Sequence, residues 1–260
     1  MRFLAALLAC LSTSALGATA TTDFSDLWYN PAESGWGVTL TQQNQILFVT
    51  LFVYQANNQP KWYVGPNTQF LGADATGAVT FSGPLYEATG PYFGNAFNPN
   101  DVQPNQVGTI TFRASQISVG TLTYTVNNTP VTKTVQRQLW QYENLTGVYI
   151  GASLGRFAGC GGRDGYYESA ATITIGHDGL NAITVKEEGA GYTCNYAGAY
   201  SQLGRMGQIA GSGTCTDGAA QSFTATEVQG GVQGMTMRYG VTFAGACTAN
   251  GRMGGVRRGS

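Results

Sequence analysis

The feature of this sequence that most limits its fold is the alternation of apolar and polar residues along nearly the whole chain, with almost no helical periodicity. Alternation of this kind is typical of β-strands, and turn-forming Asn, Asp, Gly and Pro separate the alternating segments. In the first half, the predicted strands are residues 36–42, 45–55, 61–65, 68–72, 78–82, 107–113, 117–126 and 131–141. In the second half, they are residues 147–153, 170–175, 181–187, 191–200, 205–214, 221–228, 232–239 and 251–258. The sequence thus predicts an all-β protein of two antiparallel meander β-barrels, and the alternative is a pair of β-sandwiches.

The cysteines divide the chain into two halves. Apart from Cys10 in the leader, the cysteines are Cys160, Cys194, Cys215 and Cys247, and none lies between residues 21 and 159. An even number of cysteines in an exported chain favours two disulfides. We therefore expect an N-terminal β domain over residues 21–142 and a C-terminal, disulfide-bonded β domain over residues 146–260.

The meander order also predicts how these cysteines pair. Alternate connections of a meander lie at the same end, which places all four cysteines at one end of the second barrel. If that barrel closes, its first and last connections are neighbours, so we expect Cys194–Cys215 and Cys160–Cys247. The alternative is a zinc site. However, the chain has no Cys-x-x-Cys pair and a single histidine, so we predict no metal site and no cofactor.

Residues 1–20 have the features of a secretory signal peptide. Arg2 provides a positive start, a short apolar core follows, and Ala18-Thr19-Ala20 fits a cleavage site. Leu7-Leu8-Ala9-Cys10 allows a second interpretation, a lipobox that would attach a lipid to Cys10. Both interpretations predict an extracytoplasmic protein, secreted or periplasmic. No later segment approaches the ~18 continuous apolar residues that a membrane-spanning helix needs.

The charge balance excludes one class of partner. The chain has 13 Lys and Arg residues, one of them in the leader, against 14 Asp and Glu, which leaves the mature protein with a formal charge of −2. Charged residues make up only 10% of the chain, whereas about 25% is usual. Nucleic-acid binding requires a basic surface, so we do not expect a nucleic-acid partner.

One run near the start of the mature chain concentrates aromatic residues around an acid: Trp28-Tyr29-Asn30-Pro31-Ala32-Glu33-Ser34-Gly35-Trp36-Gly37. Aromatic neighbours could raise the pKa of Glu33 and make it a general acid, with Asp23 or Asp26 as the second carboxylate that a glycosidase needs. The structural alternative is that Glu33 accepts hydrogen bonds from backbone N–H groups of the turn. We favour this structural role, and Glu33 is the one catalytic candidate.

Aromatic residues are the other functional signal, because their rings stack on sugars or bury apolar ligands. The expected ligand-binding residues are Trp28, Tyr29, Glu33, Trp36, Trp62 and Tyr92. Core packing is the alternative role for these aromatic side chains. Trp62 and Tyr63 are neighbours on a strand and point to opposite faces, so at least one is exposed or covered by the segment 83–106. This segment is rich in Pro, Gly and aromatic residues, and we predict a long loop there.

The remaining candidates have weaker patterns. His177, the single histidine, lies in a Gly-His-Asp-Gly hairpin turn, so we expect a solvated side chain and no catalytic triad. Arg113, Lys133 and Arg137 alternate with apolar residues, which places them on the solvated face of their strands. In a closed barrel they could instead point inward onto Glu33 or Glu87.

The run at residues 28–37 resembles a motif, W-x-N-P-x-E-S-G-W-G, of a family of uncharacterised bacterial secreted proteins. The likeness extends over residues 46–54, 59–63, 89–94, 124–126 and 133–138. It implies export and a bacterial source, and it implies no catalytic residue. The Trp-Tyr-Asn start also resembles the first strand of avidin-like barrels, so barrels of the avidin or lipocalin kind are expected. The Pro-Ala-Glu-Ser turn departs from that pattern, so the likeness implies no ligand.

Many aromatic residues and few catalytic ones favour a non-catalytic binding module, whose aromatic cluster holds a glycan or a small apolar ligand. One alternative is a hydrolase that acts on polysaccharide through Glu33. The other is a purely structural or adhesive surface protein. A pocket with Glu33 and a second carboxylate would favour the hydrolase, an open aromatic groove the binding module, and a filled barrel the structural protein.

Overall fold

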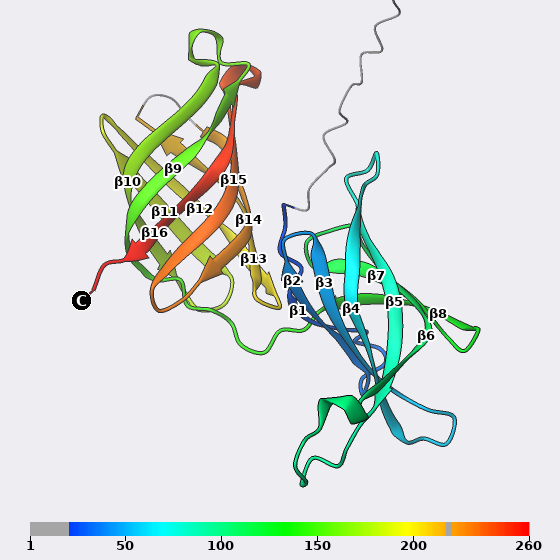
Figure 1. Ribbon diagram of the computed structural model, residues 1–260. Coiled ribbons are helices and arrows are strands. Elements are labelled where there is room, and N and C mark those ends of the chain that lie inside the picture. The colour runs from blue at the N-terminus through cyan, green and yellow to red at the C-terminus, as the bar shows by residue number, and fades with distance from the viewer. Residues whose placement is uncertain (1–20, 217–219, 260) are drawn as a thin grey trace, which may run out of the picture.

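The computed structural model describes residues 21–216 and 220–259, which form two closed antiparallel β-barrels (Figure 1). Neighbouring strands in each barrel follow one another in the chain, and the first strand pairs with the last. The predicted pair of meander barrels is therefore confirmed, and the sandwich alternative is wrong. The signal peptide and the lipid site at Cys10 lie outside the described residues.

The N-terminal barrel differs from the predicted strand pattern in three places. Its strands are β1 (Asp26–Tyr29), β2 (Gly37–Gln43), β3 (Ile46–Tyr54), β4 (Pro60–Ala73), β5 (Val79–Thr89), β6 (Gln103–Ala114), β7 (Val119–Val126) and β8 (Thr129–Arg137). The alternation does not predict β1, because this strand is short and runs directly into the Asn-Pro turn. The segments 61–65 and 68–72 form one strand, β4, whose register against β5 shifts between Val64 and Gln69.

The predicted loop over residues 83–106 is the third difference. Strand β5 continues to Thr89 and β6 begins at Gln103, which leaves residues 90–102 and the short 3-10 helix η1 (Pro99–Asp101) between them. Pro84 and Pro104 suggest a loop in the sequence, yet both pair within the β5–β6 ladder. The long loop was therefore wrong at both ends, because a few prolines did not prevent these two strands from pairing.

The C-terminal barrel contains a strand at every predicted position. It consists of β9 (Gly147–Ala158), β10 (Gly165–His177), β11 (Ala182–Gly189), β12 (Tyr192–Leu203), β13 (Met206–Cys215), β14 (Ala220–Gly230), β15 (Gly234–Phe243) and β16 (Thr248–Arg257), with short 3-10 helices η2 (Gly161–Arg163) and η3 (Ala244–Ala246). Strands β9 and β16 pair continuously along their length and close the barrel.

Both expected disulfides are present. Cys160–Cys247 joins the β9–β10 connection to the β15–β16 connection, and Cys194–Cys215 joins directly opposed residues of β12 and β13. The two bridges lie at the same end of the barrel, which we call the disulfide end. It lies at the top of Figure 1, away from the segment that links the barrels.

Large apolar side chains fill the interior of the N-terminal barrel. Trp28, Phe81 and Phe112 are fully buried, and the ring of Trp28 lies 4.9 Å from that of Phe112. Arg137 is also fully buried, with its guanidinium 4.8 Å from the centre of the Trp28 ring and an ion pair to Asp26. Its side chain donates three further hydrogen bonds to backbone carbonyl oxygens, so this buried charge is fully compensated.

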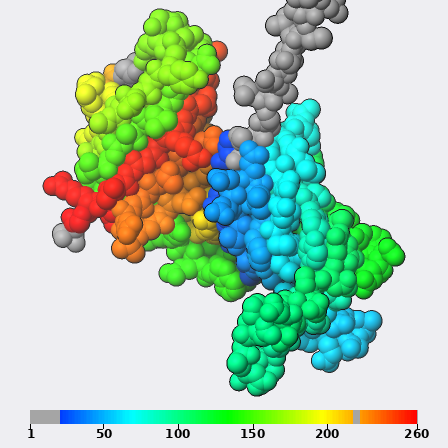
Figure 2. Space-filling model, in the orientation of Figure 1, coloured from blue at the N-terminus to red at the C-terminus, as the bar shows by residue number. Residues whose placement is uncertain are grey.

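The two barrels touch through the hairpin between β12 and β13. Gly204 has a φ of +59°, and a Cβ atom there would lie 2.3 Å from Asp26 Oδ2, so this position requires glycine. Asp26 Oδ2 accepts a hydrogen bond of 3.0 Å from the backbone N–H of Arg205. Thr22 Oγ1 donates to Glu227 Oε1 on β14 at 2.7 Å. Figure 2 shows the N-terminal residues of the first barrel packed against the second.

Among the residues that the structure describes, we find no helix with the length and apolar character that crossing a membrane requires.

Candidate ligand cavity in the C-terminal barrel

The C-terminal barrel holds an internal cavity of about 250 Å³ near its disulfide end. Its wall combines aromatic, hydroxyl and carboxylate side chains with one disulfide. The lining residues are Ser153, Phe157, Arg163, Tyr167, Glu168, Ser169, Glu187, Tyr192, Cys194, Tyr196, Cys215, Tyr239, Val241, Phe243 and Ala249. Farther from the disulfide end, the fully buried side chains of Ile173, Phe223 and Met237 fill the barrel. The cavity therefore occupies only the part of the barrel near the disulfide end, and packed side chains close it off below.

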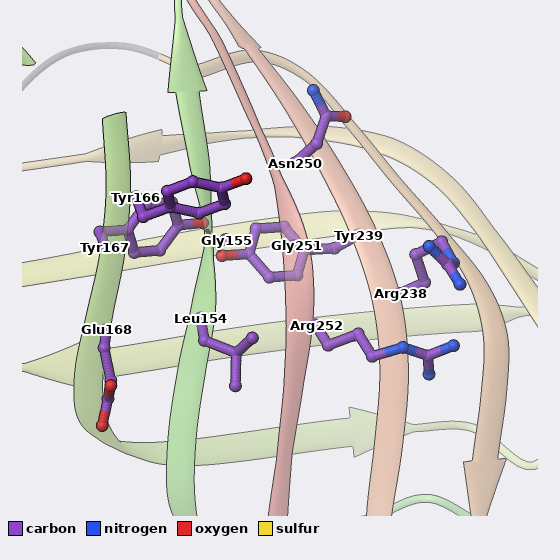
Figure 3. A pocket seen from close by; sticks show the side chains of 10 residues that line it. All are labelled: Leu154, Gly155, Tyr166, Tyr167, Glu168, Arg238, Tyr239, Asn250, Gly251 and Arg252. Atoms are coloured by element: carbon purple, nitrogen blue, oxygen red, sulfur yellow. Dashed lines mark hydrogen bonds between the residues drawn. The ribbon is translucent and has the colours of Figure 1, made fainter. Parts of the chain in front are cut away.

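Two glycines and two tyrosines form one wall of this cavity. Tyr167 on β10 pairs with Gly155 on β9, Gly155 pairs with Gly251 on β16, and Gly251 pairs with Tyr239 on β15. All four positions face inward, so the glycines leave room for the two rings. The Tyr167 and Tyr239 hydroxyls meet in a hydrogen bond across that space, and Figure 3 shows the two side chains reaching toward each other.

The glycines of this row cannot be exchanged freely. A Cβ atom on Gly155 would lie 2.8 Å from the Tyr167 hydroxyl and 2.3 Å from the Asn250 carbonyl oxygen. A Cβ atom on Gly251 would lie 2.1 Å from the Leu154 carbonyl oxygen. The wall therefore depends on close approach of neighbouring backbones, which a side chain would prevent.

A buried carboxylate belongs to the same wall. Glu187 on β11 is only 4% exposed, and its Oε1 accepts hydrogen bonds from Ser153 Oγ at 2.5 Å and from the Tyr192 hydroxyl at 2.7 Å. Within the described residues, no ion pair joins Glu187 to a lysine or arginine. A buried carboxylate is costly unless it is hydrogen-bonded and paired, so this group is only partly compensated by the protein.

Three tyrosines of the cavity stay neutral over a wide pH range. Burial raises the pKa of Tyr167, Tyr192 and Tyr239 above the ordinary value of a tyrosine. For Tyr239, the neighbouring Tyr167 adds to this effect. The cavity therefore offers neutral hydroxyls, which donate and accept hydrogen bonds, beside aromatic ring faces and one carboxylate.

The outer side of the glycine wall carries a hollow with a different character. Its lining includes Arg238 and Arg252, whose charges suggest an anion site (Figure 3). Both arginines form ion pairs with the buried carboxylate of Glu227, to which Thr22 of the N-terminal barrel also donates. Their charge is thus compensated within the protein, so these two arginines do not mark an anion site.

Trp28 does not fit the expected ligand-binding role. Its ring is fully buried in the N-terminal barrel, and its Nε1 donates a hydrogen bond of 3.0 Å to the Phe24 carbonyl oxygen. The expectation for Trp28 is corrected accordingly, since core packing accounts for this residue. The motif that contains it is thus partly a core element.

Glu33 has partners other than those expected. Its carboxylate pairs with Lys133 Nζ at 2.7 Å and accepts a hydrogen bond of 3.0 Å from Trp36 Nε1. The hydrogen bond from Lys133 holds the pKa of Glu33 below its ordinary value, with a smaller contribution from Trp36. The expectation of a raised pKa is therefore wrong, and the expected bonds from backbone N–H groups are replaced by these side-chain contacts. Glu33 thus connects the β1–β2 turn to Lys133 on β8 through an ion pair.

The other expected ligand-binding residues are dispersed. Trp36 packs partly buried against the core, and Tyr29 pairs with Gln136 in the β1–β8 ladder. Trp62 is 52% exposed on the outer face of β4, and Tyr92 is 63% exposed in the segment between β5 and β6. Trp62 is exposed while its neighbour Tyr63 is buried, so the expectation that they face opposite ways is confirmed.

The single histidine and the strand cations differ from expectation in part. His177 Nδ1 accepts a hydrogen bond of 3.4 Å from the Leu145 backbone N–H, and its ring packs against Tyr200, so it is not simply solvated. Arg113 forms an exposed ion pair with Asp74, as a solvated residue can, whereas Arg137 is fully buried. Reasoning on single strands could not place Arg137, because its partners come from the start of the chain.

Apart from Cys194 and Cys215, the cavity residues were not predicted from the sequence, although one signal was present. Ile183, Val185 and Glu187 occupy the same face of β11, and all three are buried. An acid at an inward position of an alternating strand is unusual, and it could have identified Glu187. The pairing of Gly155 with Gly251 had no comparable signal, because it depends on closure of the barrel.

No family model matches the chain, and no curated protein matches it. Among solved structures, the chain is similar to a protein of unknown function from the DUF3598 family of Nostoc punctiforme PCC 73102. The two are 11% identical, the match covers 94% of this chain and 96% of the other, and the TM-score is 0.25. A likeness this slight carries no inference about activity. The resemblance of residues 28–37 to a secreted family stays a prediction.

Proposed function

We propose that this chain is a non-catalytic, extracytoplasmic binding protein that holds a small molecule in the cavity of its C-terminal barrel. The cavity is the observation that carries the proposal. It encloses space beside aromatic rings, hydroxyls and a buried carboxylate, while the remaining interior of the barrel is packed. Ligand sites in proteins share this combination of apolar walls with a few convergent polar groups.

The surroundings of the cavity support a binding role. Cys194 and Cys215 line it, and the second disulfide ties the connections at the same end of the barrel. Such crosslinks hold the mouth of the barrel in one shape, which lowers the entropic cost of ligand binding. Disulfides also persist in oxidising compartments, which is consistent with export.

Catalysis by Glu33 receives no comparable support. Its pKa is lowered by Lys133 and Trp36, whereas a general acid at neutral pH needs a raised pKa. The Glu33 carboxylate is already engaged by Lys133 and Trp36. A structural role, in which Glu33 connects the β1–β2 turn to β8, explains these contacts without any catalytic function.

A second candidate is a glycan-binding face on the N-terminal barrel. Strand β3 carries three outward-facing rings, those of Phe48, Phe52 and Tyr54. On the neighbouring strand β4, Trp62 pairs with Phe52. Each of these four side chains is between 44% and 54% exposed. Exposed rings in a row can stack on sugars. Binding of the intact protein to immobilised polysaccharide, and its loss in Trp62→Ala, would favour this site over the cavity.

A thermal-shift screen of the full mature chain tests the principal proposal. The panel comprises sugars, amino acids, amines, short fatty acids and alcohols. A ligand at about 100 times its Kd stabilises the folded state by roughly 2.7 kcal/mol, which gives a clear rise in Tm. Failure of every class on this panel would contradict the proposal.

Two variants locate the binding site. Ser169 lines the cavity, whereas Ala170 is exposed on the outer face of the same strand. Ser169→Phe fills the cavity and is expected to abolish the shift, while Ala170→Phe is expected to leave it unchanged. Circular dichroism confirms that both variants fold. Equal shifts in the two variants would place the ligand elsewhere.

A further inference from the structure

We propose that the cavity of the C-terminal barrel selects a small organic ammonium ion, a choice of ligand that rests on the proposed binding function. Glu187 lies 4% exposed in the cavity wall, and none of the ion pairs between described residues joins it to a lysine or arginine. Two hydroxyls donate to one of its oxygens, which orients the carboxylate but leaves its charge unpaired. A bound cation would supply the missing partner.

Aromatic rings surround the same space. Phe157, Tyr167, Tyr192, Tyr196, Tyr239 and Phe243 all line the cavity. Ring faces carry partial negative charge and attract cations, and several rings around one site form the cage that recognises alkylated ammonium groups. Rings also accept the methyl or methylene groups of such a ligand. The carboxylate therefore matches the charge of an organic ammonium ion, and the aromatic rings match its alkyl groups.

The wall already holds one cation in this manner. The guanidinium of Arg163 lies 5.4 Å from the centre of the Phe157 ring at the cavity. Arg163 belongs to the short helix η2 beside the Cys160–Cys247 bridge, whereas Glu187 lies on β11. A cation on an aromatic face is therefore part of the chemistry of this barrel end.

The size of the cavity restricts the ligand further. A volume of about 250 Å³ is slightly less than the roughly 300–1,000 Å³ of sites for drug-sized molecules. The ligand is therefore a compact amine, and a polymer could not enter. The narrow choice of charge and size makes the inference testable with simple probes.

The test compares two probes of the same shape on the full mature protein. Choline carries a quaternary ammonium group, and 3,3-dimethylbutan-1-ol replaces its nitrogen by carbon. Butylamine and butan-1-ol form a second pair for primary amines. In isothermal titration calorimetry at neutral pH, we expect at least one cation to bind about tenfold more tightly than its neutral counterpart.

Charge variants then assign the preference to one residue. Glu187→Gln keeps the shape and removes the charge, so it is expected to abolish the tenfold preference. Glu188→Gln is the matched control, because Glu188 is the next residue on β11, is partly exposed and forms an ion pair with Lys186. It is expected to retain the preference. A preference that survives Glu187→Gln would overturn the inference.

The outcomes separate this inference from the proposed function. Equal affinity of the wild-type protein for a cation and its neutral counterpart would overturn ammonium selection and leave a binding cavity intact. Binding of neutral or acidic members of the thermal-shift panel alone would do the same. Because these comparisons use the wild-type protein, they decide the question even if Glu187→Gln fails to fold.

Discussion

The N-terminal barrel places Trp28, Phe81 and Phe112 in its interior, whereas the C-terminal barrel places Gly155, Gly251 and Glu187 at inward positions. The strand order is the same in both. A closed meander thus fixes which residues face inward, but the size and polarity of those residues decide whether the interior is solid or hollow. The comparison shows why function cannot be assigned from barrel topology alone.

The barrels also close by different means. Strands β9 and β16 pair from Thr248 to Arg257, and the barrel adds two disulfides. The β1–β8 ladder contains only the pairs Trp28–Arg137 and Tyr29–Gln136. The ion pairs of Glu33 with Lys133 and of Asp26 with Arg137 reinforce this short seam. Both barrels have a packed core, but the N-terminal barrel closes through a short ladder with ion pairs and the C-terminal barrel through a long ladder with two disulfides.

Removal of both disulfides should have the largest effect. We expect a loss of about 2–4 kcal/mol per bridge in the C-terminal barrel, because the bridges restrict its unfolded chain. The N-terminal barrel has no cysteine among residues 21–159 and should keep its protection. Hydrogen exchange of oxidised and reduced protein measures the two barrels separately. Equal loss of protection in both would show that they unfold as one unit.

Substitution of Trp28 tests the opposite barrel. Trp28→Ala should lower the free energy of unfolding of the N-terminal barrel by about 3–5 kcal/mol, since it leaves a cavity in a packed core. Trp62→Ala is the control, because this ring is 52% exposed, and it should change stability by about 0.5 kcal/mol or less. Urea titrations of both variants provide the measurement. Similar losses would mean that Trp62 is as much a core residue as Trp28.

The glycine wall gives a smaller, local effect. Gly251→Ala should destabilise the C-terminal barrel by about 1–3 kcal/mol, because the new Cβ forces backbones apart. Gly231→Ala is the matched control, since a Cβ there meets no atom within 4 Å. Thermal unfolding compares the two. An unaffected Gly251→Ala protein would show that the wall can move and that the cavity is not rigid.

The pH dependence of the contact between the barrels should be weakest. Burial raises the pKa of Asp23, but hydrogen bonds from Ser25 and the ion pair with Arg205 outweigh it and lower the pKa below 3.8. The unfolded chain therefore binds a proton first, so Asp23 stabilises the fold above pH 3.8 and loses this contribution as pH falls through its lowered pKa.

Asp23→Asn measures this contribution. The Tm difference between wild type and Asp23→Asn should be largest near neutral pH and shrink below pH 3.8. Asp101→Asn serves as a control, because Asp101 lies in the distant β5–β6 segment. A difference that does not change with pH would mean that Asp23 acts through shape and not through charge.

The alternation of residues predicts most of the fold because each strand pairs with its neighbour in the chain. It locates all eight strands of the C-terminal barrel, and closure then explains both disulfides. It fails at β1, where the two tryptophans of the motif suggest a surface. Trp28 is buried instead, because β1 must join β2 and β8 to complete the barrel.

The candidate site was harder to predict for a physical reason. Its wall joins Tyr167, Gly155, Gly251 and Tyr239, which come from opposite ends of the second half of the chain. Local pattern cannot show which glycines meet across a seam. The aromatic residues of the N-terminal motif have structural roles instead: Trp28 packs in the core, and Trp36 donates a hydrogen bond to Glu33.

Arg137 and Asp26 give the molecule one further property. Arg137 is fully buried in the first barrel, and the Asp26 carboxylate that pairs with it also accepts a hydrogen bond from the backbone N–H of Arg205 in the second. Separating the two halves would remove one hydrogen-bond donor from Asp26 and expose Arg137 to water. The first half expressed by itself would thus have a buried ion pair that is less well covered. A fragment that contains only the first barrel should therefore need a substitute for the β12–β13 hairpin.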